Sequence, residues 1–93
     1  EISVNYTHSG ITDPVPTGAT ISIYEDSSYQ SWIRNFESDN GKITFQTFVG
    51  WTENTKLYFQ YSSRDIIWTT NYRGEITVEE LINQRTITLR RGY

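Results

Sequence analysis

The dipeptide Asn40-Gly41 is the feature that most restricts how this chain can fold. Both residues accept the positive φ values that the two central positions of a tight hairpin turn require. Residues 42–48 follow directly and alternate apolar and polar side chains, as a strand with two different faces does. We therefore expect a β-hairpin at the centre of the chain, with Asp39, Asn40 and Gly41 in a purely structural turn.

The same period-two alternation recurs on both sides of this turn and predicts further short strands. The expected strands cover residues 2–7, 19–24, 29–37, 42–48, 57–61, 66–70 and 86–91. In the last of them, Ile87 and Leu89 are expected to face inward. The segment 12–18 holds both prolines and the segment 71–75 holds Gly74, so both are expected to be loops.

A short helical turn is the one exception to the β pattern. Thr77 and Glu80 have the spacing of a capping box, which predicts at most one helical turn near residues 78–83. Seven short strands fit an all-β fold, and we expect a seven-stranded antiparallel Greek-key β-sandwich. The chain has no βαβ spacing, which argues against a parallel sheet. Its 93 residues are expected to form a single domain, residues 1–93.

Composition and charge exclude several classes of function. The chain has no cysteine, which removes disulfides, thiolate catalysis and Cys-based metal sites. Its net charge of −3 is unlike that of nucleic-acid-binding modules, which are usually basic. Arg85, Arg90 and Arg91 near the end are expected to form a solvated strand edge. No apolar run approaches the roughly 20 residues of a membrane span, so a membrane is expected only through a removed lipid anchor.

The residues that could support catalysis do not form a catalytic set. His8 is the only histidine, and its neighbour Ser9 would point to the opposite face of a strand. Glu79 and Glu80 are adjacent, whereas the two carboxyl groups of a glycosidase face each other across a cleft. We therefore expect no enzyme activity and no catalytic residues.

The acidic residues near the central turn are also expected to be structural. Calcium takes about six to eight oxygen ligands, usually from one loop with alternating carboxylates. Asp26, Glu37, Asp39 and Asn40 provide too short a grouping for a self-contained site. We expect no metal and no cofactor, and assign these residues to turns.

The aromatic residues are the remaining candidates for a binding function. Three Trp, seven Tyr and four Phe are too many to be fully buried in so short a chain. Trp51 lies in a polar connection, Tyr72 in an expected loop, and Trp68 in a short expected strand. Two roles stay open for these three residues. They shield the ends of the core, or they contact a ligand or partner as exposed aromatic anchors do.

Three segments resemble a known family. Residues 16–24, PTGATISIY, are similar to the second strand of carboxypeptidase-regulatory-like domains, which are transthyretin-like (prealbumin-like) β-sandwiches. Residues 36–45, FESDNGKITF, match the strand–turn–strand that follows in that family, with Ser38 where a threonine is usual. Residues 56–61, KLYFQY, look like the next strand. The resemblance covers roughly residues 2–61, and its motifs specify a fold and not an activity.

The resemblance implies a non-catalytic accessory or structural module of a bacterial, Bacteroidetes-type, surface or secreted protein. Such a module would act in spacing or protein interaction, in the cell envelope or outside the cell. Its partners would be other protein domains or cell-surface polysaccharide, and not nucleic acid. Two alternatives stay open. One is a carbohydrate-binding module that uses Trp51, Tyr72 or Trp68, and the other is a transthyretin-like oligomer that binds a small ligand.

Overall fold

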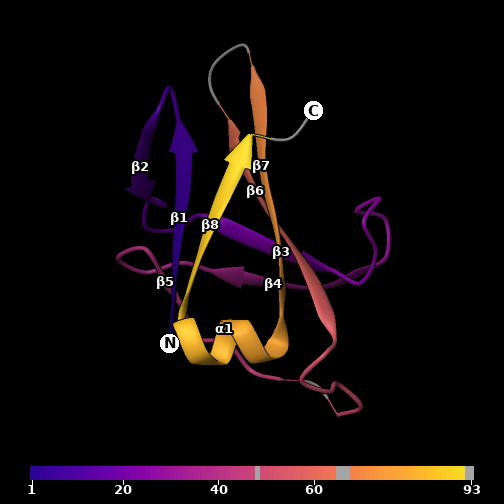
Figure 1. Ribbon diagram of the computed structural model, residues 1–93. Helices are drawn as coiled ribbons and strands as arrows, with labels where there is room; N and C mark the ends of the chain where they lie inside the picture. Colours follow the sequence, from indigo (N-terminus) through magenta and orange to yellow (C-terminus); the bar gives the residue numbers. More distant parts are fainter. Residues whose placement is uncertain (48, 65–67, 92–93) are drawn as a thin grey trace.

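The computed structural model describes residues 1–47, 49–64 and 68–91, which form eight strands and one helix (Figure 1). In chain order the elements are β1 (Ile2–His8), β2 (Ile11–Pro14), β3 (Thr20–Tyr24), β4 (Trp32–Glu37), β5 (Lys42–Ile43), β6 (Lys56–Arg64), β7 (Thr69–Thr77), α1 (Val78–Gln84) and β8 (Thr86–Arg91). The all-β class with one short helix is confirmed. The expected number of seven strands was wrong, since the described residues form eight.

The strands form one mixed sheet in the order β2-β1-β8-β7-β6-β3-β4, and β5 adds to β1. Neighbouring strands are antiparallel except β1 and β8, which are parallel from Ser3–Thr86 to Thr7–Arg90. The expectation of a wholly antiparallel sheet was therefore wrong at this pair. Two parallel neighbours must be joined by a long crossover connection, which is usually a single helix. Here all the elements between β1 and β8 form that connection, so no βαβ spacing is needed.

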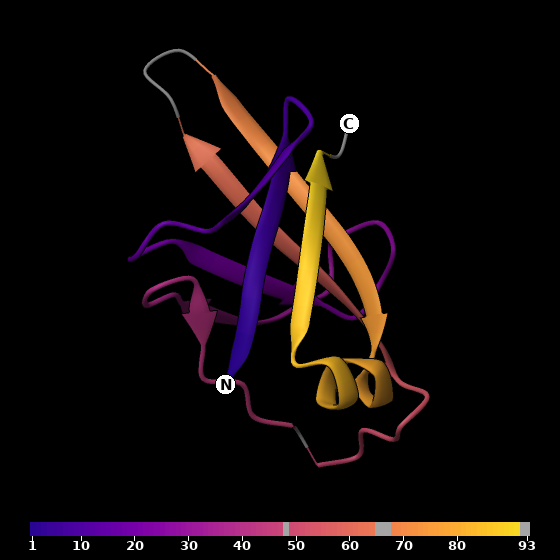
Figure 2. The same cartoon turned by 60° about the vertical axis from the view of Figure 1, so that its left-hand side comes forward.

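The sheet folds over at a short seam between β7 and β8. Along this seam Tyr72 pairs with Arg91 and Arg73 with Arg90, whereas β6 and β7 pair at nine positions. Figures 1 and 2 both show β1 and β8 side by side, and Figure 1 shows β3 and β4 running crosswise behind them. The apolar faces of the two halves thus face each other and enclose the core.

Inward-pointing side chains from both halves make up this core. The fully buried residues include Val4, Ile21, Leu57, Phe59 and Leu89. Tyr6 of β1 meets Tyr61 of β6 with ring centroids 5.3 Å apart, which is a direct contact across the core. The predicted inward orientation of Ile87 and Leu89 is confirmed.

Strand β4 departs from simple alternation because of a β-bulge. Ile23 pairs with Arg34, but the next residue, Tyr24, pairs with Trp32, so Ile33 has no partner across the ladder. The extra residue changes which positions face inward, and both Ile33 and Phe36 pack against the core. Alternation alone predicts that these two residues lie on opposite faces, which was wrong because a bulge leaves no periodic signal.

The Asn40-Gly41 turn forms as predicted. Asp39 and Lys42 exchange both backbone hydrogen bonds, at 2.8 and 3.0 Å from nitrogen to oxygen. Asn40 and Gly41 have φ values of 53° and 77°, which is the conformation that their sequence favours.

The strand after this turn has an unexpected partner. Lys42 and Ile43 pair with Ser3 and Ile2 of β1 and do not continue a hairpin with β4. The expected strand over 42–48 was wrong beyond Ile43, and residue 48 lies outside the described residues. A hydrogen bond of 2.8 Å from the Val4 backbone nitrogen to the Gly41 carbonyl oxygen anchors the turn to β1 instead.

Two segments expected to be loops are strands. Ile11–Pro14 forms β2 at the edge of the sheet, where the missing N–H of a proline interrupts no ladder. Residues 71–75 lie inside the unbroken β7, which also takes in the end of the expected strand 66–70, whose residues 66–67 are outside the described range. Gly74 serves close packing here, since a Cβ would lie 3.0 Å from Leu89 Cδ2.

Helix α1 begins at the predicted capping box. Thr77 Oγ1 accepts a hydrogen bond from the Glu80 backbone nitrogen at 3.2 Å, and the Glu80 carboxylate accepts one from the Thr77 backbone nitrogen at 3.5 Å. Val78 and Leu81 are buried beneath the helix. The helix thereby covers one end of the core, between β7 and β8 (Figure 1).

Candidate functional site

Trp68 is the most exposed of the three aromatic residues predicted to contact a ligand. Its exposed fraction is 71%, and it lies just before β7. It lines a hollow of about 500 Å³ together with Ser63, Thr69, Thr70, Tyr72 and Arg91. The structure therefore brings two predicted residues, Trp68 and Tyr72, to one concave surface at the end of the sheet.

Tyr72 contributes to this hollow from the core side. It lies within β7, so the predicted loop position was wrong, and only 8% of it is exposed. Its ring stacks on Tyr61 at 5.9 Å and meets the edge of Tyr6 at 4.9 Å. Three tyrosines from three strands thus close this end of the core, and burial raises the pKa of Tyr6 above its ordinary value of 10.0.

Trp51 lies elsewhere and packs against the core. Its ring is stacked on Phe45 with centroids 6.0 Å apart, and Phe45 in turn contacts Phe36 and Phe59. Both Trp51 and Phe45 are partly buried. Trp51 therefore does not share a surface with the Trp68 hollow, and its contacts are those of a residue that shields the core.

A second aromatic group lies on the outer face of the sheet and was not singled out from the sequence. Tyr24 and Tyr58 are paired neighbours in β3 and β6. Tyr29 folds back onto them from the β3–β4 loop, with centroids 5.4 Å from Tyr24 and 5.8 Å from Tyr58. Since Ile23 and Phe59 point inward, alternation already places Tyr24 and Tyr58 outward. The return of Tyr29 depends on the loop conformation, which alternation does not reveal.

Asp26 holds the loop that carries Tyr29. Its carboxylate accepts hydrogen bonds from the backbone nitrogens of Gln30 and Ser31, at 3.0 and 2.8 Å, and from the Ser28 hydroxyl. These bonds, that of Ser28 first, lower the pKa of Asp26. The loop can then keep Tyr29 at a positive φ of 58° above the outer face. Burial raises the pKa of the Tyr29 phenol, and the nearby Arg73 partly opposes this effect.

A row of polar side chains crosses the outer face of the sheet, with one residue from each of the strands in the order β2-β1-β8-β7-β6-β3-β4. We call it the outer row, and strand register defines it as Asn35, Ser22, Gln60, Arg73, Arg90, Thr7 and Thr12. Three pairs within the row are hydrogen-bonded: Ser22 to Asn35 at 2.8 Å, Arg73 to Gln60 at 2.7 Å, and Thr7 with Thr12 at 2.9 Å. The row is therefore a continuous strip of hydroxyl, amide and guanidinium groups.

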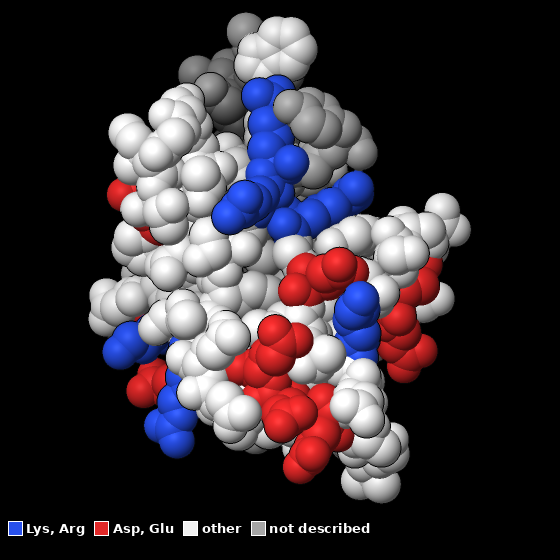
Figure 3. Space-filling view, viewed as in Figure 1, with Lys and Arg blue, Asp and Glu red and all other residues white. Residues whose placement is uncertain are grey.

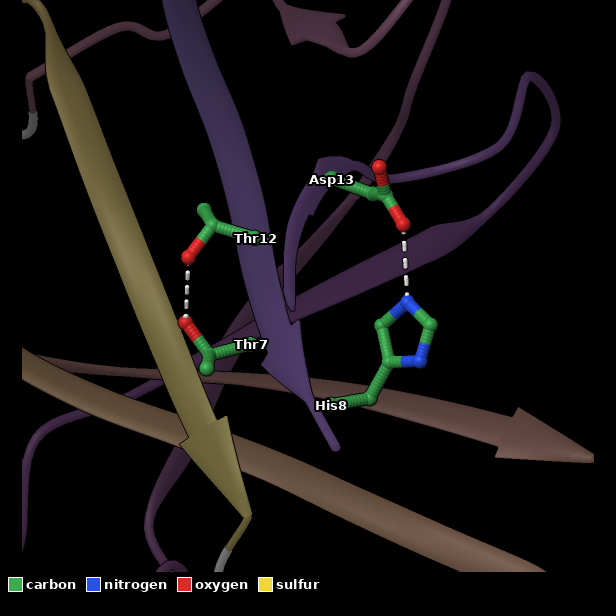
Figure 4. Close-up of polar contacts among 4 residues, drawn as sticks. All are labelled: Thr7, His8, Thr12 and Asp13. Carbon is green, nitrogen blue, oxygen red and sulfur yellow. Dashed lines mark hydrogen bonds and ion pairs between the residues drawn. The ribbon is translucent and has the colours of Figure 1, made fainter. Parts of the chain in front are cut away.

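His8 lies partly buried at the edge of β1 and β2, on the face opposite the outer row. Its Nε2 is 2.8 Å from an Asp13 carboxylate oxygen, and its ring stacks on Tyr6 at 4.8 Å. Figure 4 shows the Thr7–Thr12 bond on one side of β1 and the His8–Asp13 contact on the other. The two threonine hydroxyls lie on the side of β1 opposite the histidine. The His8–Asp13 contact therefore serves to link β1 to β2.

The described residues contain no group of three or more His, Cys, Asp or Glu residues that could hold a metal ion. Within the same residues, the single helix is too short to cross a membrane. The chain has no significant match to any family model, curated protein or solved structure.

Proposed function

We propose that this domain is a non-catalytic accessory module of a bacterial surface or secreted protein that acts as a spacer between other domains. The proposed fold is a prealbumin-like sandwich, in which the two halves of the curled sheet are the two layers. The observation that supports spacing best is the parallel pairing of β1 with β8. It makes the first and the last strand neighbours that run in the same direction.

This pairing determines where the chain enters and leaves the domain. In both Figures 1 and 2, β1 starts at the end beside α1, and β8 finishes at the far end. A strand advances about 3.3 Å per residue, so the seven residues of β1 separate these ends by roughly 20 Å. Neighbouring domains attached to the two strands would therefore lie at opposite ends, as in a spacer. A domain with adjacent ends would instead fold the chain back.

Small-angle scattering from one, two and three copies joined in tandem tests this proposal. The domain measures 40 × 26 × 22 Å, so the maximum dimension should grow by 22 to 40 Å with each added copy. Compact particles whose maximum dimension stays nearly constant would contradict a spacer. Hydrolysis of an ester, glycoside or peptide panel at a rate well above background would contradict the non-catalytic part.

Carbohydrate binding at the Trp68 hollow is a second candidate function, favoured by the 71% exposure of Trp68 beside hydroxyl-bearing Ser63, Thr69 and Thr70. Exposed aromatic rings with polar neighbours can contact both the faces and the hydroxyl groups of sugars. Tryptophan fluorescence should shift when a neutral polysaccharide binds, and Trp68→Ala should abolish binding. The absence of a shift across a glycan panel would remove this candidate.

A further inference from the structure

The centre of the outer row holds two arginines at directly opposed positions. Arg73 of β7 and Arg90 of β8 are Cα partners at the seam where the sheet folds over, and both lie on the outer face. Like charges directly opposite each other destabilise a pair of strands. Among the described residues, no carboxylate forms an ion pair with either guanidinium group. The pair therefore concentrates positive charge that the described part of the chain does not neutralise by contact.

The two guanidinium groups differ in how they are held. Arg73 donates its Nε–H to Gln60 Oε1 at 2.7 Å, and its Cζ lies 4.4 Å from the centroid of the Tyr29 ring. These contacts orient Arg73 and leave its terminal nitrogens as donors. Arg90 is exposed, and its side chain has no hydrogen-bond partner among the described residues. One fixed and one movable arginine can together bind an anionic group.

The surrounding charges favour a narrow anionic ligand. Figure 3 shows one group of Lys and Arg in the upper part of the view, where β8 ends, and Asp and Glu from directly below it down to α1, with other Lys and Arg side chains at the lower left and on the right. Glu75 lies two residues from Arg73 on the same face, and Lys56 pairs with its carboxylate at 3.6 Å. The protein as a whole carries a net charge of −3 and repels a broad acidic surface. A single polymer strand that contacts the two arginines covers less of this acidic surface than a broad ligand would.

The other residues of the outer row indicate what kind of polymer could bind there. On both sides of the arginines lie amide and hydroxyl side chains, namely Gln60, Ser22 and Asn35 on one side and Thr7 and Thr12 on the other. Neighbouring strands are about 4.8 Å apart, so a polymer lying across them meets a new polar side chain at that interval. We propose that the outer row binds a polysaccharide that carries carboxylate or sulfate groups, with the anionic groups at Arg73 and Arg90.

The test measures binding of the wild-type domain to polygalacturonate and dextran sulfate, with unsubstituted dextran as the uncharged comparison. The two charged polymers should bind with affinity that falls as salt rises, and unsubstituted dextran should bind far more weakly. Arg90→Gln should weaken binding of the charged polymers by about tenfold or more, the usual effect of losing a charged hydrogen bond. Arg85→Gln, with the same charge change at the C-cap of α1 and outside the outer row, should leave binding nearly unchanged.

Stability measurements separate a ligand role from a structural one. Arg90→Gln removes one of two opposed charges, so its midpoint in urea should equal or slightly exceed that of the wild type. A clear loss of stability would mean that Arg90 supports the fold, and would overturn the proposal.

Three further results would also overturn it. These are equal weakening by Arg85→Gln, loss of charged-polymer binding in Trp68→Ala with Arg90→Gln unaffected, and binding of poly-glutamate or single-stranded DNA as tight as that of the anionic sugars. The last result would show a general polyanion surface in place of a glycan site.

Discussion

The inner and outer faces of the same strands are built from different side chains, although the residues alternate one by one along the chain. On β6, Phe59 is fully buried, while its neighbour Gln60 lies in the outer row. On β8, Leu89 is fully buried and the next residue, Arg90, is exposed. The inner face stabilises the fold by burial, and the outer face is therefore available for contacts with other molecules.

The largest expected effect compares two adjacent residues of β6. Phe59→Ala should lower the free energy of unfolding by about 3–5 kcal/mol, because it leaves a cavity where Leu57, Phe45 and the β3 side chains pack. Gln60→Ala should lower it by only about 1 kcal/mol, because it removes one side-chain hydrogen bond, from Arg73 Nε, and leaves no cavity in the core. Urea denaturation of both variants provides the measurement. Equal losses would contradict the assignment of the two faces.

Two glycines with the same φ test how tightly the central turn packs on β2. Gly41 and Gly10 both have a φ of 77°, but only at Gly41 would a Cβ approach another residue, 2.7 Å from Pro14 Cβ. Gly41→Ala should therefore cost about 2–4 kcal/mol, since backbone strain and a steric clash add. Gly10→Ala should cost only the strain, about 1 kcal/mol. If thermal unfolding gives the same loss for both, Gly41 does not pack against Pro14.

The capping box of α1 should have a smaller effect. Thr77→Ala removes the hydroxyl that accepts from the Glu80 backbone nitrogen, and should cost about 1 kcal/mol. Thr77→Ser keeps a hydroxyl that can cap the helix and should retain most of the stability. Chemical denaturation of the two variants distinguishes capping from the loss of a methyl group, since a serine variant as weak as the alanine variant would exclude capping.

The smallest predicted effect is a pH dependence from the outer tyrosine cluster. The pKa of Tyr29 is raised in the folded state, chiefly by burial. Its contribution to stability is therefore fully present below the ordinary value of 10.0 and is lost as the pH rises through the higher folded value. Urea midpoints measured from pH 9 to 11 should fall, and Tyr29→Phe should reduce the fall. An unchanged pH profile in Tyr29→Phe would contradict a partly buried phenol.

The sequence predicted the local features well because they depend on neighbouring residues. The Asn40-Gly41 turn, the Thr77–Glu80 capping box and the inward side of β8 all follow from backbone preference or alternation. The partners of the strands could not be predicted in the same way. The pairing of β5 with β1 joins residues that are distant in sequence, Ile43 with Ile2 and Lys42 with Ser3, and no local preference reveals it.

The same limit of sequence-based prediction applies to the candidate binding surfaces. The sequence predicted that some of the aromatic residues are exposed without deciding which, and in the structure Trp68 is exposed whereas Tyr72 is buried. The outer row was not found, because its seven members come from seven strands and are joined only by register across the sheet. Arg90 was assigned to a solvated edge, since the sequence does not show that Arg73 lies opposite it. A row of this kind becomes visible only when the order of the strands is known.

Mapping of ligand contacts by NMR is the most direct test of a stabilising inner face and a binding outer face. Dextran sulfate should be titrated into the labelled domain while backbone amide and arginine Nε signals are followed. We predict shifts centred on Arg73 and Arg90 that extend to Gln60 and Thr7, with little change around α1 or Trp51. Shifts confined to the Trp68 hollow or spread evenly over the surface, or no shifts at all, would contradict this division between the faces.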